Sequence, residues 1–199
     1  MNMTGVTFYF DIGSPYAYLA AQRMERLLPE PVVWQPVLLG GLFKLTGRSS
    51  WALGDYRRRQ AGMAEIERRA RSHGLAPMRW PDPWPTDYLT AMRAVTYAFT
   101  VERGRELTMG IFRNAFHRGR EMSRPAQVLA ASVEAGLRRE DVELAIEDPA
   151  IKQRLRDATD AAYELGVFGV PTFAAGGELF WGEDRLEDAA AYHRAARAA

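Results

Sequence analysis

The chain of 199 residues is long enough for one sizeable domain, or for a domain that carries a large insertion. Hydrophobic residues make up 47% of it and charged residues 26%, which are ordinary globular proportions that argue against a disordered or membrane-embedded chain. A formal net charge of +1 argues against a dedicated nucleic-acid binder, so neither a nucleic acid nor a membrane is expected as a partner.

The sequence contains no cysteine. Disulfides, thiolate metal ligands and a Cys-x-x-Cys pair are therefore ruled out, and we expect no disulfide oxidoreductase. His73, His117 and His193 are far apart without ligand spacing, so no metal site is expected. The first residues lack a basic region followed by a long apolar run, so we expect no signal peptide and a cytoplasmic protein.

The first elements predict a strand, a helix and a second strand. Residues Val6 to Phe10 form an aromatic strand pattern that breaks at Gly13. Ser14 is suited to the N-cap of the following helix, residues 15 to about 28, because a proline occupies its first position. Residues 32 to 37 read as the next strand, which predicts a βαβ unit with a parallel pair.

The middle of the chain predicts amphipathic helices separated by glycine and proline. Their approximate ranges are 55–72, 87–103, 107–117, 125–135 and 148–165. The basic cluster at residues 57–59 favours a solvated helix face over an anion site. Between the first two helices lies a loop in which Trp80 and Trp84 are candidates for a pocket wall or for core packing.

The end of the chain returns to β structure. Residues 172–175 and 178–181 flank two glycines, which predicts a hairpin, and residues 184–187 resemble a capping box that opens a last helix. The order βαβ, then helices, then ββα predicts an α/β protein of the thioredoxin-like fold with a large all-helical insertion. We expect a thioredoxin-like domain from residues 1–40 plus 164–199, and a helical insertion domain from residues 41–163.

Ser14 is the main candidate for chemistry. The first N–H groups of a helix favour an anion nearby, and in a chain without cysteine that anion cannot be the protein's own thiolate. The alternative is that Ser14 only caps its helix.

Four motifs together identify a resemblance to a known family. The 2-hydroxychromene-2-carboxylate isomerases, which are similar to kappa-class glutathione transferases within the DsbA-like group, resemble this chain over nearly its whole length. The motifs are Phe-Asp-x-x-Ser-Pro-x-x-Tyr-Leu at 10–19, Pro-Val-Leu-Leu-Gly at 36–40, Gly-Val-Phe-Gly-Val-Pro-Thr-Phe at 166–173 and Phe-Trp-Gly-Glu-Asp-Arg-Leu at 180–186.

The resemblance implies roles for three of these residues. Ser14 would donate a hydrogen bond to the sulfur of bound glutathione and lower the pKa of the glutathione thiol. The peptide bond between Val170 and Pro171 would be cis, with the backbone before the proline pairing with the thiol peptide; the alternative is that Pro171 only begins a strand.

The resemblance also marks departures from the family. Asp184 matches the aspartate that holds the γ-glutamyl group, although it could equally be an N-cap. Glu183 adds a carboxylate where the family has serine, which would repel the γ-glutamyl carboxylate and predicts that glutathione binds weakly, with mycothiol or no thiol in its place. Arg48 and Arg58 stand nearest to a family asparagine and lysine, and could hold a carboxylate.

The expected function is that of an enzyme, a thiol-dependent isomerase acting on an unsaturated aromatic-derived acid as its small-molecule substrate. Glutathione or another low-molecular-weight thiol would be the cofactor, and its thiolate would add to the substrate, allow rotation and leave again. The alternatives are a kappa-like transferase or peroxidase, and a non-catalytic DsbA-like binding module. The resemblance also implies a homodimer.

Overall fold

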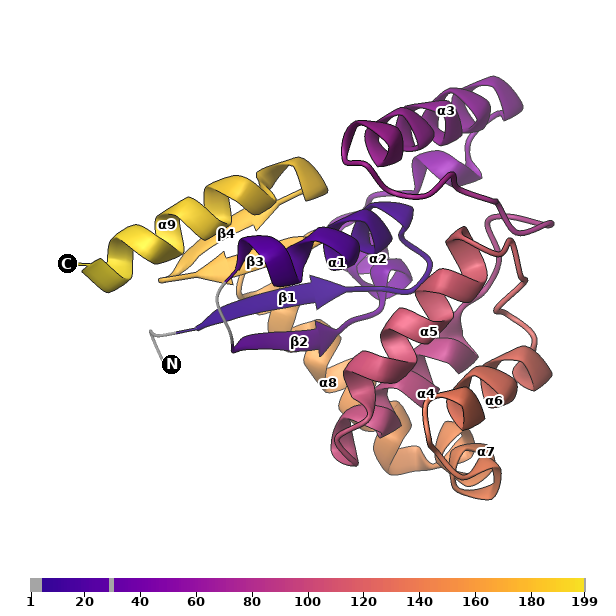
Figure 1. Ribbon diagram of the computed structural model, residues 1–199. Coiled ribbons are helices and arrows are strands. Elements are labelled where there is room, and N and C mark those ends of the chain that lie inside the picture. Colours follow the sequence, from indigo (N-terminus) through magenta and orange to yellow (C-terminus); the bar gives the residue numbers. More distant parts are fainter. Residues whose placement is uncertain (1–4, 29–30, 199) are drawn as a thin grey trace.

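The computed structural model describes residues 5–28 and 31–198, so the outermost residues of the predicted thioredoxin-like domain, 1–4 and 199, lie outside it. A four-stranded sheet has the order β2-β1-β3-β4 (Figure 1). β1 (Val6–Phe10) pairs in parallel with β2 (Val32–Pro36), as predicted. On the other side, β1 pairs antiparallel with β3 (Thr172–Ala175), which forms the predicted hairpin with β4 (Glu178–Trp181).

Aromatic side chains from three strands build the centre of the core. Phe8 in β1 is opposite Trp34 in β2 and Phe173 in β3, and its ring centroid lies 5.1 and 5.3 Å from theirs. All three rings are buried. Such cross-strand aromatic pairs stabilise the register of the sheet and hold β1 between its neighbours.

Nine α-helices and two 3₁₀ turns are found in the described part of the chain. They are α1 (Pro15–Leu27), α2 (Leu39–Thr46), η1 (Trp51–Leu53), α3 (Tyr56–Ser72), α4 (Leu89–Thr100), α5 (Gly104–Phe116), α6 (Pro125–Glu134), α7 (Arg139–Glu147), α8 (Pro149–Glu164), η2 (Glu183–Arg185) and α9 (Leu186–Ala198).

Two of these helices were not predicted, and both begin without a capping side chain. α2 has Leu38 and α7 has Arg138 at the N-cap, neither of which is a capping residue type. α2 is instead held by other parts of the fold, because the Leu38 amide donates to the hydroxyl of Thr159 in α8 at 2.9 Å. Tertiary contacts therefore supply what the local sequence lacks.

The helices cover the sheet unevenly. α9 packs on β3 and β4 beside α1, whereas α8 packs against β2, and α4 to α7 gather on the β2 side of the molecule (Figure 1). α3 stands at the opposite end of the picture from the chain termini. Among the described helices, none is both long enough and apolar enough to cross a membrane.

The predicted capping box at the start of the last helix is not formed. Asp184 lies inside η2, and α9 begins at Leu186. The carboxylate of Glu187 is an ion-pair partner of Arg23 in α1. A long-range charge pair has therefore replaced the local capping interaction that the sequence predicted.

Candidate active site

Ser14 occupies the N-cap of α1, where β1 turns into the helix. Its backbone is extended (φ −94°, ψ 109°), and Pro15 follows at the first helical position. The Ser14 hydroxyl accepts a hydrogen bond from the Ala17 amide at 3.2 Å and donates one to the Val170 carbonyl at 3.4 Å. The predicted cap is therefore present, and the same hydroxyl also touches the loop before β3.

The loop before β3 lies directly against Ser14. The peptide bond between Val170 and Pro171 is cis, as the resemblance implied. The Gly182 amide donates to the Pro171 carbonyl at 2.9 Å, which ties this loop to the end of β4. At Gly169, an added Cβ would approach the indole nitrogen of Trp181 to 2.7 Å, so the close packing of this loop requires glycine.

A cavity of about 420 Å³ opens beside Ser14. Its lining combines the serine turn, the proline loop, aromatic rings and charged groups. The lining residues are Gly13, Ser14, Pro15, Tyr16, Leu39, Phe43, Ser50, Trp51, Ala52, Arg69, Trp84, Pro85, Gly169, Val170, Pro171, Trp181, Gly182, Glu183, Asp184 and Arg185.

An aromatic cluster makes one wall of the cavity. Trp51 contacts Trp84 at 5.6 Å and Tyr16 at 6.4 Å between ring centroids. Trp51 packs so closely on α3 that a Cβ at Gly62 would lie 2.2 Å from its ring. Trp80 stands behind Trp84 and outside the lining, so of the two candidate tryptophans only Trp84 forms the pocket wall.

Glu183 is buried, with 1% of its side chain exposed, and its carboxylate is held in ion pairs. Its carboxylate accepts hydrogen bonds from Arg23 at 2.7 Å and from Arg69 at 2.9 Å. The ring of His73 lies 3.2 Å from the same group. This pairing weakens the predicted repulsion between Glu183 and a γ-glutamyl carboxylate, which stays a prediction.

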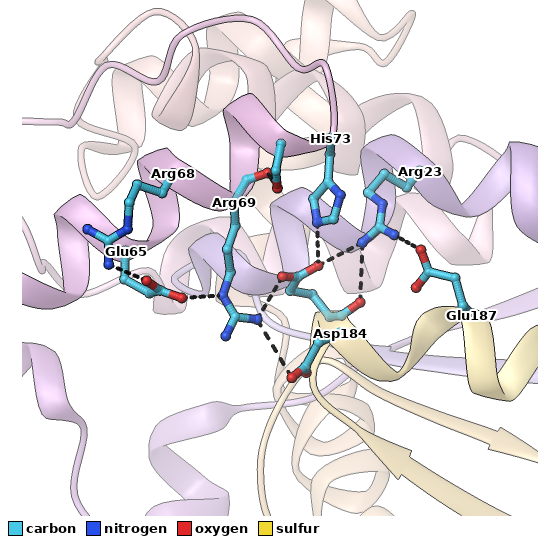
Figure 2. Close-up of polar contacts among 9 residues, drawn as sticks. Arg23, Glu65, Arg68, Arg69, His73, Asp184 and Glu187 are labelled. Atoms are coloured by element: carbon cyan, nitrogen blue, oxygen red, sulfur yellow. Dashed lines mark hydrogen bonds and ion pairs between the residues drawn. The ribbon is translucent and has the colours of Figure 1, made fainter.

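Arg69 is a cavity cation that the sequence analysis did not identify. Its Nε donates to Glu65 at 2.8 Å, and Nη1 lies 3.7 Å from the carboxylate of Asp184 (Figure 2). Hydrogen bonds that Arg69 donates to Glu65 and Glu183 raise the pKa of its guanidinium, so it stays charged. In the sequence, the spacing of Glu65 and Arg69 looks like an ordinary surface pair on a helix.

Asp184 lines the cavity and is also exposed to solvent, with 62% of its side chain accessible. With Arg69 beside it, the cavity presents a carboxylate and a guanidinium next to each other. This pair provides opposite charges for a ligand head group that carries both signs.

The two cations that the sequence predicted, Arg48 and Arg58, are not among the residues that line the cavity in the described part of the chain. Arg58 is exposed in the first turn of α3. Arg48 is also exposed, and its guanidinium lies 4.4 Å from the centre of the Phe168 ring. Phe168 in turn contacts the cavity residue Trp181 at 4.8 Å. The cavity lining therefore does not support the two predicted ligand contacts, and it contains the guanidinium of Arg69 instead.

Asp11 lies at the end of β1, behind the serine turn. Its carboxylate accepts hydrogen bonds from the amides of Gly13 at 2.7 Å and Leu39 at 2.8 Å. Burial raises the pKa of Asp11 to about 6, although these two hydrogen bonds act in the opposite direction.

The sheet, the serine-capped helix and the proline loop define a class of protein. It is a thioredoxin-type protein in which a hydroxyl stands where thiol-handling members of this fold usually carry a cysteine. A family model described as DSBA-like thioredoxin domain matches residues 5–193. The chain therefore belongs to the DsbA-like thioredoxin family, and the predicted fold class is confirmed.

Comparison with known proteins agrees with this assignment. Human glutathione S-transferase kappa 1 is 27% identical over 204 residues, which cover 92% of this chain and 87% of the relative. The 2-hydroxychromene-2-carboxylate isomerase of Pseudomonas putida is 27% identical over 190 residues, which cover 91% and 90%. A solved 2-hydroxychromene-2-carboxylate isomerase matches with a TM-score of 0.82 at 26% identity, covering 98% of this chain and 97% of that chain. These similar proteins are enzymes, and the resemblance predicted from the motifs is confirmed.

Proposed function

We propose that this protein is a thiol-dependent isomerase acting on an unsaturated acid derived from an aromatic ring. The observation that carries the proposal is the hydroxyl of Ser14, which stands at the N terminus of α1 beside the Val170 carbonyl and borders a cavity of about 420 Å³. The similarity to isomerases over most of the chain supports the same class of reaction.

The residues present fit a low-molecular-weight thiol such as glutathione. Once bound, the thiol supplies a nucleophile that adds reversibly to a conjugated double bond, so that rotation about the resulting single bond changes the isomer. Ser14 would donate to the sulfur of the bound thiol the hydrogen bond that it now donates to the Val170 carbonyl. The positive end of the α1 dipole favours the ionised sulfur over the neutral one.

The charge pair of Arg69 and Asp184 supports glutathione in particular. An α-amino acid head group carries a carboxylate and an ammonium, which match the guanidinium and the carboxylate that lie 3.7 Å apart. The pairing of Glu183 with Arg23 and Arg69 also supports glutathione, because a paired carboxylate repels the γ-glutamyl carboxylate less than a free one would.

The aromatic wall suits the proposed substrate. Trp51, Trp84 and Tyr16 offer flat apolar surfaces, against which a planar conjugated acid would bury its ring. The cavity holds that ring near Ser14, so the contribution of the chain is to orient the two reactants and to activate the sulfur.

A kappa-like glutathione transferase is the second candidate. The similarity to the human kappa transferase is as extensive as that to the isomerases, and the site around Ser14 would suit either reaction. In a transferase the adduct with the thiol would be released as a stable product.

One series of measurements tests the proposal. Glutathione is titrated by calorimetry and by the ultraviolet absorbance of its thiolate, and the loaded protein is then given a hydroxychromene-type acid and, separately, chlorodinitrobenzene. Isomer formation without thiol consumption supports the isomerase, and a stable conjugate supports the transferase. Thiol or peptide binding without turnover of either compound would instead indicate a binding module.

Substituting Arg69 by methionine should weaken glutathione binding by about ten- to hundredfold, because a charge-assisted hydrogen bond is lost. The matched control is Arg68→Met, which removes an exposed arginine that shares the partner Glu65 but lies outside the cavity lining. Calorimetric titration of both variants measures the difference. Equal affinity in the two variants would contradict the role of Arg69.

A further inference from the structure

A single buried carboxylate connects two segments that meet at the cavity. Asp11 Oδ1 accepts from the amide of Gly13, the residue before Ser14, at 2.7 Å. Its Oδ2 accepts at 2.8 Å from the amide of Leu39, the first residue of α2. α1 and β2 lie between the two segments in the sequence, and this side chain links them across the fold.

Both connected segments contribute to the cavity. Gly13 and Ser14 line it from the serine turn, and Leu39 and Phe43 line it from α2. α2 begins at an apolar residue that cannot cap it, so the Asp11 carboxylate acts as the acceptor at its N terminus, where the helix dipole also favours a negative charge.

We propose that the ionised carboxylate of Asp11 is a positioning group that clamps the serine turn to the start of α2, and that the cavity loosens when this carboxylate is protonated. Protonation converts one of the two oxygens into a hydroxyl, which is a poorer acceptor for an amide. This inference extends the proposed function, because the geometry that Asp11 holds is that of Ser14 beside the cavity.

A gain in folding stability does not explain why the protein buries the carboxylate of Asp11. Burial raises the pKa of Asp11 to about 6, above the usual value of about 3.9 for an aspartate. The protonated form of Asp11 therefore stabilises the folded protein. This stabilisation is fully present below the pKa that Asp11 has in the unfolded chain, and it is lost as the pH rises through about 6. At neutral pH the charged group opposes folding while it fixes the two amides.

Two titratable groups face Asp11, both from the segment that begins α4. The negative charge of Asp87 raises the pKa of Asp11 further, and Asp87 also accepts from the Leu89 amide at 2.8 Å. The phenol of Tyr88, buried against Gly13, has its own pKa raised to about 12 by burial, and so it stays neutral.

The test compares amide hydrogen exchange, expressed as protection factors, in the wild type and in Asp11→Asn. Asparagine resembles the protonated carboxyl in size and offers one acceptor and one donor. At neutral pH we expect the Gly13 or Leu39 amide that loses its acceptor to be less protected by about tenfold. The Val37 amide, which donates to the Phe10 carbonyl at 3.0 Å, is the internal reference and should not change.

The wild type provides a second measurement that does not depend on the variant folding. Protection of the same two amides should fall as the pH drops through about 6. In Asp87→Asn, which keeps an acceptor oxygen for the Leu89 amide but removes the charge, this transition should move to lower pH. Unchanged protection in Asp11→Asn, or no transition in the wild type, would overturn the clamp.

Thiol binding separates this inference from the proposed function. If the wild type binds no thiol, the isomerase proposal fails, while the exchange data still decide whether the clamp exists. If it binds glutathione, the fraction of bound thiol that is ionised should fall in Asp11→Asn, because Ser14 is less well held. A bound thiol that ionises equally in both proteins would overturn the positioning role.

Discussion

Replacing Ser14 by alanine should reduce thiol-dependent activity by about two to three orders of magnitude, the usual effect of removing a donor that stabilises a developing negative charge. The same change should lower the free energy of unfolding by only about 1 kcal/mol, because the lost hydrogen bond is that of a helix cap. The hydroxyl makes two contacts, with the Ala17 amide of its own helix and with the Val170 carbonyl of the loop before β3.

Activity as kcat/KM and unfolding in urea measure these two effects separately. A matched control is Ser132→Ala, which removes another buried serine hydroxyl, in α6, that donates to the Val128 carbonyl at 2.9 Å. This control should retain full activity. If Ser14→Ala is as active as the control, Ser14 is only a helix cap.

The second large effect concerns stability. Changing Glu183 to glutamine should lower the free energy of unfolding by about 3 kcal/mol, because it leaves Arg23, with 3% of its side chain exposed, without its buried charge partner. The loss stays near the lower end of the range for buried pairs, since the amide oxygen is still an acceptor and Glu187 still pairs with Arg23. This outcome is the opposite of what a repulsive Glu183 would give.

Glu187→Gln is the matched control, because it removes the other partner of the same arginine. The side chain of Glu187 is half exposed, so its pair with Arg23 should contribute less than about 1 kcal/mol. Urea unfolding of the two variants gives the comparison. Equal stability of both variants, together with tighter glutathione binding by Glu183→Gln, would contradict the stabilising ion pair between Glu183 and Arg23. It would support the prediction that the charge of Glu183 repels glutathione.

The sequence alone determined the elements that depend on neighbouring residues. Ser14 followed by proline specifies a helix start through capping and a fixed φ angle, and both act within one helical turn. The two glycines at 176 and 177, which have positive φ, specify the hairpin in the same local way. Because strand, helix and hairpin signals are local, their order was enough to predict the thioredoxin-like fold.

Only the tertiary structure decided the charges of the cavity. Glu183 is separated from Arg69 by 114 positions and from Arg23 by 160, and no local pattern indicates that these groups meet. The start of α2 likewise depends on the carboxylate of Asp11, 28 residues earlier. Helix periodicity placed Arg69 on a polar face but could not show that the face borders the cavity, because burial and pairing arise from packing between distant segments rather than from sequence spacing.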